Sequence, residues 1–391
     1  MGGGSITLIA HRKQSDTYGG LLPTDAQLLF LKACILEPTE ALAAWQQWRA
    51  GHATDSLDDA YASLVPQLYC NLRAAGYQGP DMEWAEAAYL RNLPFNQGLV
   101  GALIPVLQRF NASGIPIMLF KGIAVSTLWY PDPRVRVMTD LDLLVPVAQA
   151  DAAMAQLEDM GWSKRFSLNS WNRPIFHQCT FSNDRGQILD LHWHLFAGAG
   201  HDDDDIVWSR AMPVRIGSEE TYTLSVSDHF LHCCAYGYGW SEERYMRWIS
   251  DAYTIYLHAE NRIEWPYIVE QAKKRRLSLR LCKALELLES IGIVQVPYET
   301  LEALRAIPVR TWEQAELAFI APPHFPSRNV WHISERKLKQ AWYKHRRLCA
   351  GQSFTLCAVT FPAMLSKEMC LTSIWLLPLG VIRGVVKVAS D

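Results

Sequence analysis

The spacing of apolar and polar residues divides the chain into two helical parts and a mixed part between them. From Thr24 to about Gly114, apolar residues recur every three or four positions, which is typical of amphipathic helices. Gly51 and Gly76 fall where two of these stretches end, as helix stops often do. The same helical spacing returns from Ser225 onward. Between these parts lie short apolar runs bounded by turn residues, and such runs indicate strands.

The mixed part opens with an apolar run at 115–120 that ends in Lys121 and Gly122. A short helical pattern and a proline-rich turn follow, and a second apolar run then carries Asp140 and Asp142. Side chains on a strand alternate between its two faces, so these two carboxylates point the same way. Because hard divalent cations prefer carboxylate oxygen, the pair forms one half of a candidate cation site.

A predicted β-hairpin supplies a third carboxylate. Residues 175–181 and 188–194 have the composition of strands, and a short turn sequence separates them. The second strand carries Asp190. An amphipathic helix at 148–161 precedes the hairpin, and we expect the chain to become helical again after Phe196.

Three short motifs in the mixed part resemble the nucleotidyltransferase superfamily. Within it, they are most similar to an uncharacterised bacterial family whose members carry L-K-G, Y-P and R-x-x-x-D-x-D-x-L-V. In the first motif of this chain, Phe120 displaces the leucine by one position. The corresponding segments are Leu119 to Gly122, Tyr130-Pro131 and Arg136 to Val145.

The resemblance implies an α+β fold, in which a minimal nucleotidyltransferase α/β core with a mixed sheet is flanked by α-helical N- and C-terminal regions. In this fold the third carboxylate comes from a strand beside the strand of the paired carboxylates, and Asp190 is the matching position. With the hydrophobic pattern, the resemblance predicts four segments. These are a flexible lead at 1–20, a helical region at 21–114, the core at 115–224 and a second helical region at 225–391.

The resemblance also implies a metal-dependent reaction. A nucleoside monophosphate would move from an NTP, foremost ATP, to a hydroxyl or phosphate of an acceptor, and pyrophosphate would leave. Asp140, Asp142 and Asp190 would be the catalytic residues and the ligands of two Mg²⁺ or Mn²⁺ ions. Two such ions stabilise both the attacking and the leaving oxygen.

Four further residues would contact the nucleotide. Gly122 would let the backbone approach the triphosphate at a helix start, where free N–H groups favour anions. Lys121 and Ser126 would contact phosphate oxygens, and Arg136 would neutralise phosphate charge.

The resemblance leaves the acceptor open among peptides, proteins, small molecules and tRNA. A peptide is one implied acceptor, because some such families are encoded beside peptide-modification genes. Two basic stretches, 273–276 and 336–347, either track a polyanion such as tRNA or form solvated helix faces. In the C-terminal helices, the resemblance makes Tyr236, Tyr238 and Trp240 candidates to stack on a base. The spacing of Arg247 and Asp251 predicts an intrahelical ion pair.

Two other interpretations stay open. His192 and His194 follow Asp190 at every second position of the same predicted strand, so the three side chains share one face. Two histidines at this spacing begin the ligand set of many metal-dependent hydrolases. The protein would then be a hydrolase that uses these three residues. Alternatively, the site is catalytically degenerate and the protein is a nucleotide-binding or scaffold module.

Composition and charge narrow the setting. A chain that is 49% hydrophobic and 20% charged can bury a large core, and a net charge of −3 gives no support for broad electrostatic binding of nucleic acid. The nine cysteines never form C-x-x-C, which is typical of reduced thiols in a cytosol. No secretion signal begins the chain, and the apolar segment Met369–Ile382 is shorter than the roughly 20 residues that a membrane span requires. We therefore expect a cytoplasmic protein without a transmembrane span.

Overall fold

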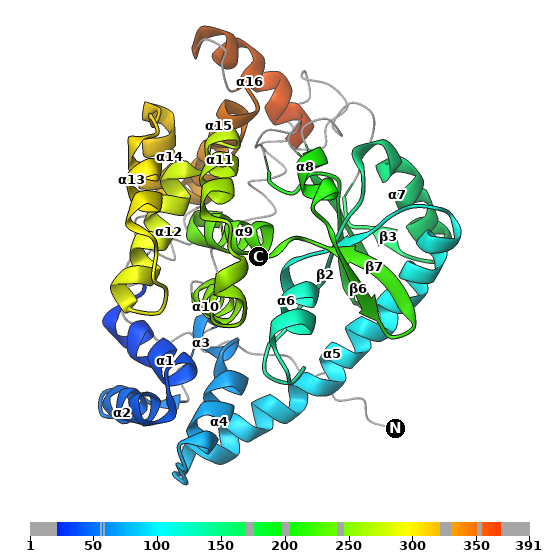
Figure 1. Ribbon diagram of the computed structural model, residues 1–391. Coiled ribbons are helices and arrows are strands. Elements are labelled where there is room, and N and C mark those ends of the chain that lie inside the picture. Colours follow the sequence, from blue (N-terminus) through cyan, green and yellow to red (C-terminus); the bar gives the residue numbers. More distant parts are fainter. Residues whose placement is uncertain are drawn as a thin grey trace.

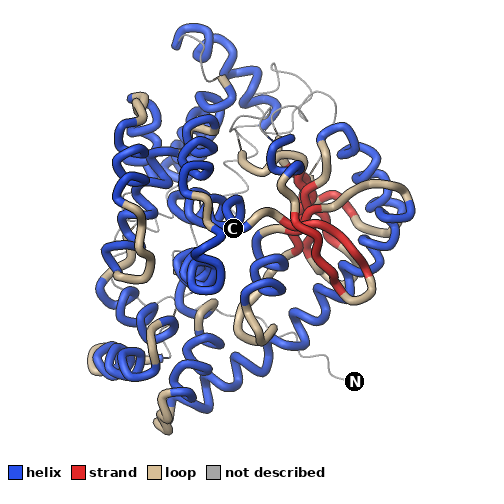
Figure 2. The backbone as a smooth tube through the Cα atoms, viewed as in Figure 1, coloured by secondary structure: helices blue, strands red, loops and turns tan. Residues whose placement is uncertain are grey.

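The fold is seen in a computed structural model, in which helices surround one sheet (Figures 1 and 2). This arrangement confirms the predicted α+β class with a mixed sheet and flanking helices. The predicted lead at 1–20 and the apolar segment Met369–Ile382 lie outside the described residues. The structure describes residues 22–54, 57, 59–166, 168, 176–197, 204–240, 246–320, 330–349 and 354–368.

The N-terminal part is helical, as its periodicity predicts. Thr24 begins the first helix with a capping box: its hydroxyl accepts a hydrogen bond from the backbone N–H of Gln27 at 3.2 Å, and its own N–H donates to the Gln27 side chain at 3.0 Å. The last helix of this part runs along the sheet (Figure 1). The helices are α1 (Asp25–Ile35), α2 (Pro38–Arg49), α3 (Asp59–Ala62), α4 (Val65–Ala74) and α5 (Asp81–Ala112).

Seven strands form one mixed sheet in the described part of the chain, in the order β3-β4-β5-β2-β1-β7-β6. The pairs β2–β5 and β1–β7 are parallel, and the other neighbours are antiparallel. The strands are β1 (Met118–Leu119), β2 (Leu141–Leu144), β3 (Ser163–Lys164), β4 (Gln178–Ser182), β5 (Ile188–His192), β6 (Met212–Ile216) and β7 (Glu219–Thr223).

The alternation of side chains along β2 gives the sheet two different faces. Leu141 and Leu143 join a hydrophobic cluster with residues of α5 and of α7 (Ala150–Asp159). Asp142 therefore points to the opposite face, where α6 (Lys121–Trp129) and the C-terminal helices lie. Leu141 and Leu143 thus pack the sheet against α5 and α7, and the opposite face carries Asp142 beside the buried Leu144.

The expectation that the chain becomes helical after Phe196 is wrong beyond the short helix α8 (Asp204–Ser209), because β6 and β7 form a hairpin. Five-residue runs with alternating burial flank the turn at Gly217, whose φ of +60° suits glycine. The second of these strands pairs with β1 and so extends the sheet beside the start of α6.

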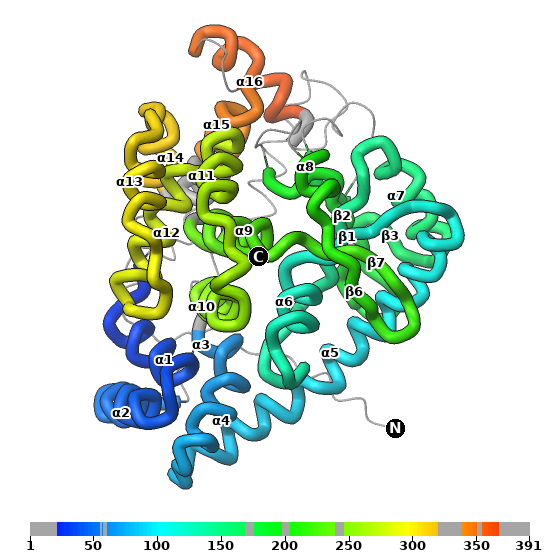
Figure 3. Tube along the Cα trace, viewed as in Figure 1, coloured from blue at the N-terminus to red at the C-terminus, as the bar shows by residue number. Residues whose placement is uncertain are grey.

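The C-terminal part is helical, as predicted. In Figure 3, α1 and α2 lie beside C-terminal helices although they are far apart in sequence, and one hydrophobic cluster contains Trp45 of α2 together with Leu281. The predicted domain limits at 114 and 224 stay a prediction. The helices are α9 (Val226–Trp240), α10 (Arg247–Ala259), α11 (Trp265–Lys274), α12 (Ser278–Ile291), α13 (Tyr298–Ala306), α14 (Thr311–Ile320), α15 (Val330–Leu348) and α16 (Phe354–Glu368).

Neither predicted basic stretch is simply a solvated helix face. The side chain of Arg275 is buried and pairs with Asp204 at 2.9 Å, and that of Arg347 is buried and pairs with Glu316 at 3.0 Å. One cation of each stretch therefore forms a buried ion pair.

None of the described helices is long and apolar enough to cross a membrane. The cysteines in the described ranges are free thiols.

Candidate active site

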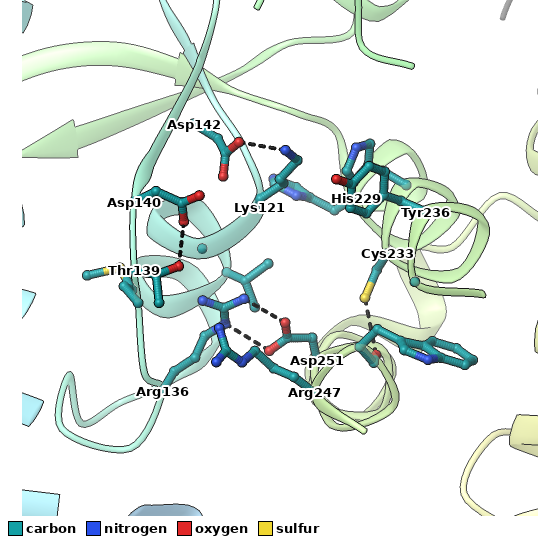
Figure 4. A pocket seen from close by; sticks show the side chains of 16 residues that line it. Lys121, Arg136, Thr139, Asp140, Asp142, His229, Cys233, Tyr236, Arg247 and Asp251 are labelled. Carbon is teal, nitrogen blue, oxygen red and sulfur yellow. Dashed lines mark hydrogen bonds and ion pairs between the residues drawn. The ribbon is translucent and has the colours of Figure 1, made fainter. Parts of the chain in front are cut away.

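The segment from Lys121 to Asp142 lines one side of a cavity of about 410 Å³, and α9 and α10 line the other (Figure 4). Lys121 and Gly122 stand at the start of α6, and Asp140 and Asp142 stand at the start of β2. The two carboxylates face the same cavity, as their spacing predicts.

The predicted third carboxylate lies beside this pair. Strands β2 and β5 run parallel in a register that sets Asp142 directly opposite Asp190. Potential ligand atoms of Asp142, Asp190 and His192 all lie within 4.8 Å of one another, and these residues form the one metal-ligand cluster found among the described residues. Asp140 lies just before the strand and accepts a hydrogen bond from the Thr139 hydroxyl at 2.8 Å.

The surroundings of Asp190 disfavour its ionised form. Its Oδ1 is buried without a hydrogen-bond partner. Burial and the nearby charge of Asp142 raise the pKa of Asp190 to about 6. A proton or a cation at Oδ1 would compensate for the burial of this oxygen, which is what a metal ligand requires.

The raised pKa of Asp190 predicts that its contribution to stability is lost as the pH rises. An aspartate of the unfolded chain titrates near about 3.9, so between about pH 4 and pH 6 the folded protein holds the proton more tightly. The stabilisation is complete below about pH 4, and up to about 3 kcal/mol of it is lost as the pH passes 6.

Asp190→Asn imitates the protonated acid, so in metal-free buffer it is expected to exceed the wild type in unfolding free energy at pH 7.5 and to match it near pH 4. Urea unfolding at both pH values measures this, with the exposed Asp184→Asn as control. An equal difference at both pH values would contradict the assignment.

Asp142 is buried, and two donors share its Oδ1. Lys121 Nζ lies 2.6 Å from this oxygen and His192 Nε2 lies 3.1 Å from it. Burial opposes the charge on Lys121, but the carboxylate of Asp142 outweighs it and the pKa of the lysine is raised. Burial, and then the charge of Lys121, hold the pKa of His192 far below its usual value. The contact is therefore between a carboxylate, an ammonium and a neutral imidazole.

The residues present fit a divalent cation. Asp142 and Asp190 face each other across two strands, the buried Oδ1 of Asp190 has no partner, and Asp140 supplies a further carboxylate in the same cavity. His194, the second histidine of the hydrolase interpretation, is hydrogen-bonded through Nδ1 to Asp204 at 3.1 Å. The donor set is thus dominated by oxygen, as Mg²⁺ and Mn²⁺ prefer.

Of the residues predicted to contact phosphate, Gly122 and Arg136 line the cavity and Ser126 does not. A Cβ on Gly122 would lie 3.1 Å from Nη1 of Arg136, so the missing side chain leaves a space between the start of α6 and the guanidinium. That Nη1 is buried and has no hydrogen-bond partner. Ser126 is buried one turn further along α6, and it does not appear among the described residues that line the cavity. A contact of Ser126 with phosphate stays a prediction.

Arg136 also joins the two sides of the cavity. Its Nε and Nη2 donate to the two carboxylate oxygens of Asp251 on α10 at 2.9 and 2.7 Å (Figure 4). The hydroxyl of Tyr130 donates to the same carboxylate at 3.2 Å. Asp251 thus forms an ion pair with the loop before β2, and its pairing with Arg247 within α10 stays a prediction.

Of the wall that α9 provides, sequence reasoning named Tyr236 and missed His229 and His232. The rings of His232 and Tyr236 stack on each other with centroids 5.2 Å apart, and Lys121 Nζ lies 4.9 Å from the centre of the Tyr236 ring. A Cβ on Gly237 would lie 2.2 Å from Trp248, so the absence of a side chain lets α10 pack closely against α9. The helical spacing of His229, His232 and Tyr236 was the available signal for this wall. Stacking of Tyr236, Tyr238 or Trp240 on a base stays a prediction.

The chain is similar to a known protein family and to solved structures. The sequence profile of a family described as uncharacterised nucleotidyltransferase matches residues 60–291. A crystal structure of an antigenic nucleotidyltransferase-like protein from Paracoccidioides brasiliensis is similar, with 15% identity and a TM-score of 0.33 over 55% of this chain and 94% of that chain. A comparison with curated proteins gave no match.

The family profile, together with the mixed sheet and its flanking helices, shows a nucleotidyltransferase-like protein. The chain belongs to the uncharacterised nucleotidyltransferase family, whose profile spans the second half of the N-terminal helices, the whole sheet and α9 to α12.

Proposed function

We propose that this nucleotidyltransferase moves a nucleoside monophosphate from an NTP to a hydroxyl or phosphate of an acceptor and releases pyrophosphate. The observation that carries the proposal is the register of β2 and β5, which sets Asp142 opposite Asp190. Asp140 faces the same cavity, and the start of α6 closes it. Three carboxylates beside a helix N-terminus suit a metal–triphosphate ligand.

Each residue has a role that follows from its surroundings. Asp140, Asp142 and Asp190 would hold two Mg²⁺ or Mn²⁺ ions, which when bound stabilise negative charge on the attacking and leaving oxygens. Asp190 would also accept the proton of an acceptor hydroxyl. Gly122 leaves room for a phosphate beside the N–H groups of α6 and Nη1 of Arg136.

The test uses the purified chain with each NTP labelled at the α-phosphate, Mg²⁺ and a cell lysate. Label is expected on an acceptor, together with pyrophosphate from one preferred NTP, for which ATP is the first choice. Fractions treated with protease or with ribonuclease then separate a peptide or protein acceptor from tRNA. A peptide or protein acceptor is tested first. Binding of NTP without transfer to any fraction would instead support a nucleotide-binding module.

Variants of the β5 residues separate this proposal from the hydrolase alternative. Asp190→Ala is expected to abolish transfer while the NTP still binds through Asp140 and Asp142. His194→Gln is expected to keep most of the activity, because His194 bonds to Asp204. Rates of pyrophosphate release and the equilibrium binding of a fluorescent NTP measure both effects. One zinc ion per chain in elemental analysis, lost in His192→Gln, would establish the hydrolase instead.

A further inference from the structure

Lys121 has an unusual position for a lysine beside a phosphate site. It is the first residue of α6, and its backbone φ of +51° lies in the left-handed region, which residues other than glycine rarely adopt. Such a conformation persists only where the surrounding contacts compensate for it. The compensating contact is the ion pair of its ammonium with Asp142, which Figure 4 shows spanning the top of the cavity.

The surroundings of the ammonium are those of a cation site. Lys121 Nζ lies 2.6 Å from Asp142 Oδ1, and it lies 5.2 and 4.9 Å from the ring centres of Phe120 and Tyr236. Aromatic faces and a buried carboxylate both attract a positive charge. The lysine side chain is 18% exposed, so the charge is held inside the protein and not on its surface.

The ammonium also contacts a carboxylate oxygen that would bind the metal. Asp142 belongs to the cluster whose ligand atoms lie within 4.8 Å of one another, and the oxygen that Lys121 contacts also receives Nε2 of His192. A lysine and a divalent cation at this carboxylate repel each other, because both are positive and little water separates them. The two cations therefore compete for Asp142.

We propose that Lys121 is an exchangeable cation: its ammonium holds Asp142 in the metal-free protein, and the arriving metal–nucleotide displaces it onto the phosphates. This inference rests on the proposed function, because it takes Asp142 as a metal ligand. It deepens that function by making the lysine a gate for the metal, so that the ion binds poorly alone and well with the triphosphate. The negative phosphates then compensate for the ammonium that leaves Asp142.

The test measures Mn²⁺ binding to the full chain without nucleotide, from the electron paramagnetic resonance signal of free Mn²⁺. Lys121→Met keeps the length of the side chain and removes its charge, so it is expected to bind Mn²⁺ about tenfold or more tightly than the wild type. The same variant is expected to transfer nucleotide more slowly, because the phosphates lose the ammonium. Lys121→Arg keeps the charge and is expected to leave Mn²⁺ binding weak. Lys283→Met, which removes an exposed lysine from an ion pair on α12, is the control.

The outcomes separate the two proposals. Equal or weaker binding of Mn²⁺ by Lys121→Met, with nucleotide transfer by the wild type intact, would overturn the exchange and leave the proposed function standing. Absence of Mn²⁺ binding by every variant, together with absence of transfer, would overturn both. Thermal unfolding in chelator gives a second measure: Lys121→Met is expected to melt lower than the wild type, and Mn²⁺ is expected to raise its melting temperature more.

Discussion

Nucleotidyl transfer is expected to fall by about three orders of magnitude or more when Asp142 is replaced by asparagine. The variant keeps the shape of the side chain and removes the charge that would hold the metal, and metal-assisted stabilisation of charge contributes several kcal/mol to such a reaction. Asp140→Asn is expected to cause a loss of similar size, because Asp140 faces the same cavity. Pyrophosphate release under saturating NTP and Mg²⁺ measures both rates.

The two variants are expected to differ in stability. Asp142→Asn removes the carboxylate that compensates for the buried ammonium of Lys121, so its unfolding free energy is expected to fall by about 1–3 kcal/mol. Asp140→Asn keeps an oxygen that can accept the hydrogen bond of the Thr139 hydroxyl, so its unfolding free energy is expected to fall less than that of Asp142→Asn. Asp184→Asn, on the exposed turn between β4 and β5, is the matched control for loss of one charge. Near wild-type activity in either Asp140→Asn or Asp142→Asn would contradict the metal assignment.

Breaking the ion pair of Arg136 and Asp251 is expected to have the largest effect on stability. Both side chains are less than 10% exposed, and the guanidinium donates to both carboxylate oxygens. Loss of one partner leaves a buried charge without compensation, which costs about 3–5 kcal/mol. Arg136→Met and Asp251→Leu are each expected to lower the unfolding free energy by this amount in urea titrations.

The double variant distinguishes the ion pair from general packing. Because Arg136→Met/Asp251→Leu leaves no unpaired charge, its loss is expected to be well below the sum of the single losses. The exposed pair Lys283–Glu286 is the control, and Lys283→Met is expected to cost less than about 1 kcal/mol. Additive losses at Arg136 and Asp251 would show that the two residues act separately.

The sequence predicted the local part of the site well. The run from Lys121 to Asp142 gives a helix and a strand because its pattern changes within a few residues, and the hairpin that carries Asp190 follows from alternation around a turn. The family resemblance supplied the step that periodicity cannot, namely that β5 lies beside β2.

The missing parts depend on contacts between distant residues. Arg136 and Asp251 are 115 positions apart, and nothing in the pattern around either residue identifies the other. The same holds for the aromatic wall of α9, because a helix that buries His232 and Tyr236 has the same periodicity whether it covers a core or a cavity. The hairpin of β6 and β7 was missed for a different reason: its runs are only five residues long, and the buried positions of β7 are the threonines Thr221 and Thr223.

The position of α10 has a consequence for how the protein is synthesised. Within this one helix, Asp251 binds Arg136 and the hydroxyl of Ser250 donates to Gln67 of α4, a residue 183 positions earlier. A growing chain therefore emerges from the ribosome with its three aspartates long before the helix that closes their cavity. Because the N-terminal helices bury part of their apolar surface with residues of α10 and α12, they stay incompletely covered until these helices are made. Chaperones that shield apolar surface would act on this interval, and catalysis would begin only after α10 has left the ribosome.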